Sequence, residues 1–179
     1  MVTPFKGIPR RPPRGVGRWL ARQPIRLYRR RLGWLLGYRF LLLTHRGRRS
    51  GRLHRTVLEV ICYGPETHES VVISGFGRGA DWYRNIRTTP ALEVQTGRLR
   101  YVPEQRFLSV DDGAAVLAEF ERRHRLAAQF IPWLVRWLAG VPYEASPAGR
   151  RAVAEAMPMV ALRPAVHPSR AAARSAGSG

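Results

Sequence analysis

The sequence predicts an α+β protein: a mainly antiparallel, six-stranded β-barrel with peripheral helices. Apolar, strand-like runs follow one another along the chain, and most are joined by short polar or glycine-rich turns. Only one short helix is expected among them, so the regular strand–helix alternation of a doubly wound parallel sheet is missing. With 179 residues, 45% of them hydrophobic, the chain can form one domain with its own core.

The N-terminal part of the chain is expected to lie outside the barrel. Residues 1–17 are rich in proline, arginine and glycine, which predicts a flexible arm. Residues 18–36 are predicted to form a basic amphipathic helix that starts again at Pro24. Two interpretations of this helix stay open: its apolar stripe packs on its own domain, or its arginines bind an anionic membrane surface.

The barrel domain is predicted to span residues 37–164. Its strands are expected at Tyr38–His45, Leu53–Cys62, Val71–Phe76, Ala91–Thr96, Arg98–Phe107 and Met159–Leu162. The fourth and fifth of these form a hairpin about Gly97.

Helices are predicted between and after the strands. They are Asp81–Thr88, a helix from Ser109 to about Leu126, Ala128–Ala139 and Pro147–Met157. The first begins at Asp81 and ends before Pro90, and the second begins with a capping-box-like pair, Ser109 and Asp112. Residues 165–179 contain mainly Ala, Ser, Arg and Gly, which predicts a disordered tail.

Positive charge is concentrated in the N-terminal third of the chain. The chain has 31 Lys and Arg residues against 12 Asp and Glu, giving a net charge of +19. Residues 1–58 hold 16 of the basic residues and no acid, since Glu59 is the first. An anionic partner is therefore expected at this part of the chain.

The densest group of polar side chains lies in the turn between the first two predicted strands. It reads Thr44-His45-Arg46-Gly47-Arg48-Arg49-Ser50-Gly51-Arg52, with Arg55 shortly after. Two glycines permit positive φ, which lets backbone N–H groups converge on an anion. Arginines add planar donors for phosphate or carboxylate, and hydroxyls add more. The turn predicts an anion site, with a plain solvated turn and a site for nucleic-acid phosphate as the alternatives.

A second polar segment runs from Ser74 to Asn85. A strand leads into a glycine-rich loop and then into a helix, and loop amides of this kind suit an anion or the polar edge of a ring. Trp82 and Tyr83 either flank a flat ring or belong to the core.

Side-chain catalysis and metal binding are not indicated. The chain shows no Ser-His-Asp, Cys-His or paired-carboxylate arrangement. Cys62 is the single cysteine, which disfavours structural zinc and suggests a reducing compartment, and the histidines show no metal-ligand spacing. If the protein is an enzyme, a cofactor is expected to supply the chemistry.

The two polar segments, in this order and separation, resemble the deazaflavin (F420)-dependent nitroreductase family. The resemblance covers Leu42–Leu58, Val71–Gln95 and the closing Met157–Pro164. It implies a split β-barrel of the flavin-reductase, FMN-binding type. It also implies that the protein binds coenzyme F420, a flavin-like ring with a phosphodiester and an oligoglutamate tail, in preference to FMN. The reduced coenzyme would pass a hydride to a small quinone or nitroaromatic acceptor.

By position, the resemblance assigns cofactor contacts and no catalytic side chain. The residues are Thr44, Arg46, Gly47, Arg48, Arg49, Ser50, Gly51, Arg55, Thr56, Val57, Leu58, Ser74, Gly75, Gly77, Arg78, Trp82, Tyr83 and Asn85. Those at positions 48–51 would contact the phosphate or tail, and Val57 and Leu58 would line the ring pocket. Arg78 stands where many relatives have a lysine. Candidates for an apolar acceptor wall are Tyr28, Trp34, Tyr38, Trp133, Trp137 and Tyr143.

Partners and location are expectations of the same kind. A small-molecule acceptor and a homodimer are expected. The location is expected to be cytoplasmic, peripheral at the inner face of the membrane through residues 18–36, because no signal peptide or transmembrane pattern is seen. The alternatives are a membrane-surface cofactor carrier without turnover and a nucleic-acid-binding protein. The latter is disfavoured because aromatic residues do not interleave with the basic run.

Overall fold

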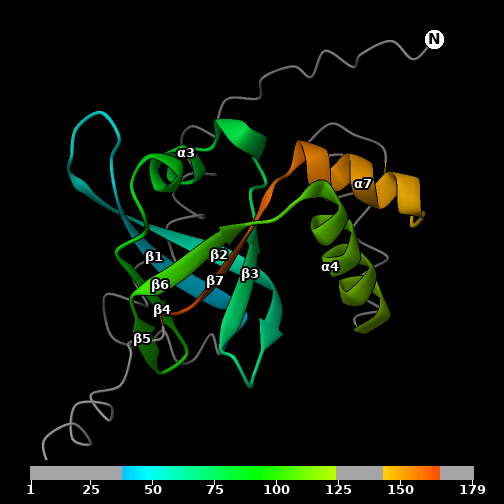
Figure 1. Ribbon diagram of the computed structural model, residues 1–179, viewed down its shortest axis with the longest axis horizontal. Coiled ribbons are helices and arrows are strands. Elements are labelled where there is room, and N and C mark those ends of the chain that lie inside the picture. The colour runs from blue at the N-terminus through cyan, green and yellow to red at the C-terminus, as the bar shows by residue number, and fades with distance from the viewer. Residues whose placement is uncertain (1–37, 124–142, 166–179) are drawn as a thin grey trace, which may run out of the picture.

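The computed structural model describes residues 38–123 and 143–165, and its core is one antiparallel sheet (Figure 1). The sheet has seven strands in the order β5-β4-β1-β2-β3-β7-β6. They are β1 (Phe40–Arg46), β2 (Leu53–Gly64), β3 (Glu69–Ile73), β4 (Glu93–Thr96), β5 (Leu99–Tyr101), β6 (Pro103–Phe107) and β7 (Met159–Pro164). The predicted arm, the helices expected at 18–36 and 128–139, and the tail from residue 166 lie outside the described residues.

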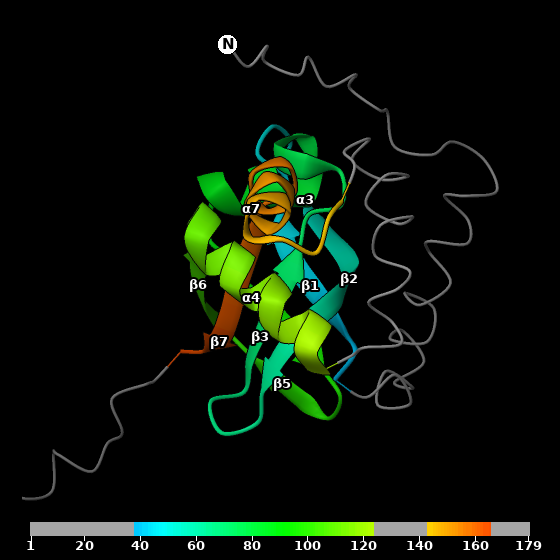
Figure 2. The same cartoon turned by 90° about the vertical axis from the view of Figure 1, so that its right-hand side faces the viewer.

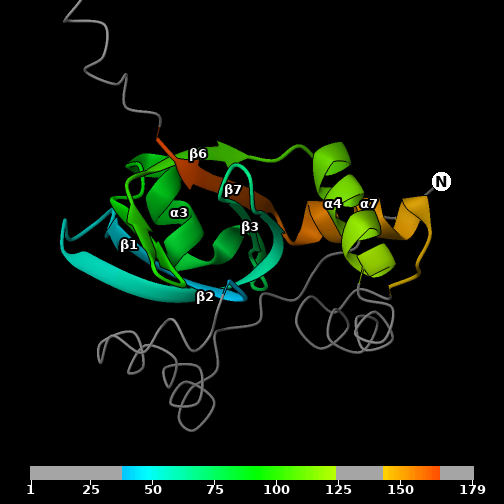
Figure 3. The ribbon, with the colours of Figure 1, turned by 90° about the horizontal axis from the view of Figure 1, so that it is seen from below.

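The two edge strands of this sheet are consecutive in the chain. β5 ends at Tyr101 and β6 begins at Pro103, so only Val102 separates the strands at opposite ends of the order. β5 pairs with β4 whereas β6 pairs with β7. Pro103 has no N–H with which to continue the β5 ladder, and the chain crosses at Val102 from one edge to the other. The crossing brings the sheet round into a nearly closed barrel (Figure 3).

The predicted antiparallel barrel is confirmed, with seven strands in place of six. The extra strand arises because the single strand predicted at Arg98–Phe107 is divided into β5 and β6. The strand predicted at Val71–Phe76 was also misplaced, since β3 ends at Ile73. Ser74 closes the turn that follows, where its Oγ donates to the carbonyl oxygen of Gly77 at 2.7 Å.

Helix α3 (Asp81–Thr88) closes the barrel interior and matches its predicted bounds. It lies within the ring of strands when the molecule is seen from below (Figure 3). Its apolar face joins a core formed by the inward side chains of the strands. This core consists of Leu41, Leu43, Leu58, Val60, Val72, Ala80, Trp82, Tyr83, Ile86, Ala91, Val94, Val160 and Leu162.

Two further helices cover the outer face of β3 and β7, as Figure 2 shows. α4 (Val110–Arg123) begins where Ser109 Oγ accepts from the Asp112 N–H at 3.0 Å, as the capping-box pattern predicted. α7 (Pro147–Ala156) begins at its N-cap, Ser146. A second core lies between these helices and the sheet: Val71, Leu117, Tyr143, Val153, Ala154, Met157, Met159 and Ala161.

The β1–β2 hairpin has an inner and an outer face, and this division organises the site. Opposite residues of an antiparallel pair share a face, and faces alternate along each strand. The pairs Leu41–Leu58, Leu43–Thr56 and His45–His54 therefore lie on the inner face with the core. The pairs Leu42–Val57 and Thr44–Arg55 lie on the outer face.

Candidate functional site

The turn between β1 and β2 is fixed by its own backbone. The N–H of Gly47 donates to the Arg52 carbonyl and the N–H of Gly51 to the Gly47 carbonyl, both at 2.8 Å. Gly51 has φ +64°, which glycine adopts without strain. A Cβ on Gly47 would lie 2.7 Å from Ser50 Oγ and 2.8 Å from His54 Nε2, so the close approach of these side chains requires glycine.

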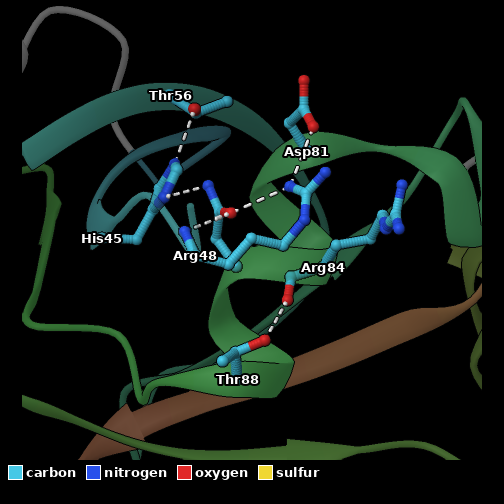
Figure 4. Close-up of polar contacts among 7 residues, drawn as sticks. His45, Arg48, Thr56, Asp81, Arg84 and Thr88 are labelled. Carbon is cyan, nitrogen blue, oxygen red and sulfur yellow. Dashed lines mark hydrogen bonds and ion pairs between the residues drawn. The ribbon is translucent and has the colours of Figure 1, made fainter. Parts of the chain in front are cut away.

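Arg48 joins the turn to helix α3 (Figure 4). Its Nη1 donates to Asp81 Oδ1 at 2.9 Å and to Asn85 Oδ1 at 3.0 Å. Its backbone N–H also donates to Asn85 Oδ1, at 3.1 Å. The two polar segments singled out in the sequence are therefore in direct contact, and Arg48 is the residue that connects them.

Asn85 also contacts residues on the inner face of the barrel. Its side-chain amide nitrogen lies 3.1 Å from Nδ1 of His45, and His45 Nε2 lies 3.2 Å from the hydroxyl of Thr56. Asn85 and His45 are only 4% and 2% exposed. Burial lowers the pKa of His45 below its ordinary 6.5, and the nearby His54 lowers it further, although the backbone of Arg46 and the charge of Asp81 act in the opposite direction.

Arg49 and Ser50 are exposed donors at the tip of the turn. Within the described part of the chain, no backbone hydrogen bond uses the N–H of either residue. Ser50 Oγ accepts a long hydrogen bond of 3.4 Å from the Arg52 N–H, so its own proton remains to donate. Two amides, one hydroxyl and one guanidinium are thus presented to solvent at the tip of a held turn.

The outer face beside the turn contains a buried hydroxyl without a partner. Thr44 is 8% exposed, and its Oγ1 makes no hydrogen bond. It pairs across the sheet with Arg55 of β2 and Glu93 of β4. A buried hydroxyl that lacks a partner is a costly arrangement, which suggests a site that is completed by a ligand.

The strands separate two residues that were predicted to share the ring pocket. Val57 lies on the outer face of β2 with Thr44 and Arg55, whereas Leu58 lies on the inner face and belongs to the core. Thr56 also lies on the inner face, where it contacts His45. A pocket on the outer face can therefore include Val57 but not Leu58 or Thr56.

The loop before α3 is built around its own hydrogen bonds. Ser74 is fully buried, and its hydroxyl and carbonyl both bond to Gly77. Gly77 has φ +64°, and a Cβ there would lie 2.8 Å from the carbonyl oxygen of Ala156. Gly75 is half-buried, and Phe76, Arg78 and Gly79 are exposed, so a ligand could reach this part of the loop.

The aromatic candidates are divided between core and surface. Trp82 and Tyr83 are 8% and 3% exposed and pack in the barrel core. Tyr143 is buried in the second core, whereas Tyr38 is 42% exposed and stacks on Tyr63 with ring centroids 4.2 Å apart. The other acceptor-wall candidates, Tyr28, Trp34, Trp133 and Trp137, lie outside the described residues.

Two members of the network were missing from the predicted set of site residues. Asp81 precedes Asn85 by four positions, and residues four apart lie on the same face of a helix. The predicted helix Asp81–Thr88 therefore already indicated that the two side chains are neighbours. His45 was not recoverable in this way, because its partner Asn85 lies 40 residues further along the chain.

Comparison with known proteins identifies the family. The sequence model of the F420H(2)-dependent quinone reductases matches residues 20–129, which is more than half of the chain. The chain belongs to this F420H2-dependent quinone reductase family. It is an oxidoreductase, and its coenzyme is F420. No curated protein matches the sequence.

Two similar solved structures share only low sequence identity with this F420H2-dependent reductase. A structure of an F420-H2 dependent reductase is 14% identical, with a TM-score of 0.45, and the match covers 70% of this chain and 94% of that one. A pyridoxamine 5′-phosphate oxidase-related, FMN-binding protein from Nostoc punctiforme is 17% identical, with a TM-score of 0.43 and coverage of 84% and 81%. The family assignment rests on the sequence match alone.

The residues of the turn and of the outer face suit an anionic coenzyme. Arg49 and Ser50 offer charged and neutral donors for phosphate or carboxylate oxygens. The unpartnered Thr44 hydroxyl offers a further buried donor on the outer face of the β1–β2 hairpin.

Within residues 38–123 and 143–165, no helix is long and apolar enough to span a membrane.

Proposed function

We propose that this reductase anchors the anionic phosphodiester and tail of F420 at the β1–β2 turn. The observation that carries the proposal is the Arg48 contact with Asp81 and Asn85. It holds the turn against α3 while the donors of Arg49 and Ser50 stay exposed. A preformed site of this kind binds an anion without first having to order a flexible loop.

Roles within the turn differ under this proposal. Arg48 is a positioning residue, since its Nη1 and its backbone N–H are occupied by α3. Arg49 and Ser50 are the direct ligands, and Arg46, Arg52 and Arg55 add positive charge around them because their side chains are exposed.

The outer face of β1 and β2 would receive the part of the coenzyme that follows the phosphate. Thr44 would donate its unpartnered hydroxyl there, beside Arg55 and the apolar Val57. On the adjoining loop, the half-buried Gly75 and the exposed Arg78 would also contact the coenzyme. These residues bind and orient, because the reduced coenzyme itself supplies the hydride when it is bound.

The acceptor is a small quinone, in keeping with the family, and we extend this proposal to nitroaromatic compounds. The exposed Tyr38 ring, which stacks on Tyr63, is one aromatic surface that an acceptor could reach, beside the exposed Phe76 and Phe107. Oxidation of the bound, reduced coenzyme by menadione in a single turnover tests the quinone, and the same assay with a nitroaromatic compound tests the extension.

Titration of the protein with F420 and, separately, with FMN, followed by fluorescence, tests the binding proposal. We expect F420 to bind at micromolar concentration or below, and more tightly than FMN. Failure of F420 to bind in this range would reject the proposed site together with its ligand.

Two associations complete the proposal. We place the basic helix predicted at residues 18–36 at an anionic membrane surface, which sedimentation with anionic and with neutral vesicles tests. Retention on neutral vesicles alone, or on neither kind, would argue against it. A homodimer is the expected assembly, and light scattering of the purified protein measures its mass directly.

A further inference from the structure

His45 has no assigned role, yet it occupies the centre of the network that holds the turn. It is the last inner-face residue of β1 and is buried, with one ring nitrogen toward α3 and the other toward β2 (Figure 4). His45 contacts Asn85, and Asn85 in turn bonds to both the backbone N–H and the guanidinium of Arg48.

The donors around Asn85 determine its orientation. The backbone N–H and the guanidinium of Arg48 can only donate, so the atom of Asn85 that meets both of them must be the amide oxygen. The amide nitrogen therefore points at His45. Because an amide NH2 group can only donate, Nδ1 of His45 has to accept and cannot carry a proton.

The bare Nδ1 of His45 also fixes the direction of the next bond. In a neutral imidazole with a bare Nδ1, the proton is on Nε2, which then donates to the hydroxyl oxygen of Thr56. Hydrogen bonds thus run in one direction from Arg48 through Asn85 and His45 to Thr56. A protonated ring would place Nδ1–H against the NH2 group of Asn85 and break the series.

The charges around the ring also favour the neutral form. Burial and the stacked His54, whose ring centroid is 5.8 Å away, both lower the pKa of His45. Asp81, together with the backbone of Arg46, acts in the opposite direction. Asp81 is itself paired with Arg48, which offsets its charge.

We infer that His45 is a positioning residue for coenzyme binding: as a neutral Nε2–H imidazole it orients Asn85, and Asn85 in turn holds Arg48 and the β1–β2 turn. This inference rests on the proposed function of the turn. It implies that the turn loosens, and that coenzyme affinity falls, when the ring gains a second proton or is replaced by an apolar side chain.

The test compares the full-length wild-type protein with three variants. His45→Leu removes both hydrogen bonds, and His45→Gln keeps an acceptor and a donor on a side chain that does not titrate. His68→Gln is the matched control, since it removes an imidazole from the turn between β2 and β3, where His68 bonds to Tyr63. Each protein is examined by hydrogen exchange of residues 46–52 without coenzyme and by its F420 dissociation constant at pH 7.5 and 5.5.

We expect His45→Leu to speed hydrogen exchange of the turn and to weaken F420 binding by about tenfold or more. A loss of this size corresponds to about one hydrogen bond. His45→Gln should retain both properties at pH 7.5. Between pH 7.5 and 5.5 its affinity for F420 should also fall less than that of the wild type. Titration of the coenzyme affects both proteins equally, so the difference between them is due to His45. His68→Gln should behave as the wild type.

Unchanged exchange and unchanged affinity in His45→Leu would overturn the inference, as would the same pH dependence in wild type and His45→Gln. If the wild-type protein does not bind F420, the proposed function fails by itself. The exchange measurement then still decides whether His45 positions the turn.

Discussion

Replacing Asn85 with alanine should destabilise the protein strongly, because Asn85 is buried and satisfies groups on two other elements. The change removes the acceptor of the Arg48 N–H and the donor to His45 Nδ1. Each buried polar group left without a partner costs about 1–3 kcal/mol. Arg48 Nη1 keeps its bond to Asp81, and the Arg48 side chain is 18% exposed, so part of the loss can be recovered through water. We expect a decrease of about 2–4 kcal/mol in the free energy of unfolding.

Urea denaturation at pH 7.5 measures this decrease, provided that the dependence on urea concentration is the same in both proteins. Arg84→Ala is the matched control, because Arg84 lies on the same helix but is exposed. The control should change stability by less than about 0.5 kcal/mol. A loss of less than about 1 kcal/mol for Asn85→Ala would refute the reasoning that the network holds the turn against α3.

Three further outcomes follow from the same structure. Because the pKa of His45 is lowered from 6.5, the unfolded chain binds its proton more readily, so the free energy of unfolding should be constant above about pH 6.5 and fall below it. Urea titrations between pH 7.5 and 5.5 measure this. Arg49→Ala should weaken F420 binding by about tenfold or more at unchanged stability, since Arg49 is exposed and the change removes the charge-assisted contact proposed for it. Gly77→Ala should cost about 1–3 kcal/mol of stability, because of its positive φ and the Ala156 carbonyl 2.8 Å from the added Cβ. Gly79→Ala is its control, since no atom lies within 4 Å of the added Cβ.

Each of these outcomes has a clear opposite. A stability profile of His45→Gln that falls with acid as steeply as the wild type would show that another group causes the loss. An unchanged dissociation constant for Arg49→Ala would move the anion site away from the turn. Equal stabilities of the two glycine variants would show that neither the positive φ of Gly77 nor its close approach to α7 requires glycine.

Local signals in the sequence predicted much of the fold. Helix α3 was predicted residue for residue, because Asp81 and Pro90 mark its ends within the segment itself. The crossing at Val102 could not be predicted in the same way. Whether Arg98–Phe107 is one strand or two depends on which strands it pairs with, and its partners β4 and β7 lie next to opposite edges of the sheet.

The candidate site shows the same division. The donors of Gly47–Gly51 are adjacent in the sequence, so the turn was visible as a cluster. The bonds of Arg48 to Asp81 and Asn85 join residues 33 and 37 positions apart, and no pattern within either segment indicates them. Arg48 was predicted as a ligand of the anion from its place in the turn, and its bonds to α3 are the part that the sequence could not indicate.

A crystal structure of the protein with bound F420 would show whether the β1–β2 turn anchors the anionic part of the coenzyme. We predict that phosphate or carboxylate oxygens of the coenzyme accept hydrogen bonds from the N–H groups of Arg49 and Ser50 and from the Arg49 guanidinium. Arg48 should remain bonded to Asn85. Bound coenzyme whose phosphate lies away from residues 47–51, with both amides left to solvent, would contradict the account.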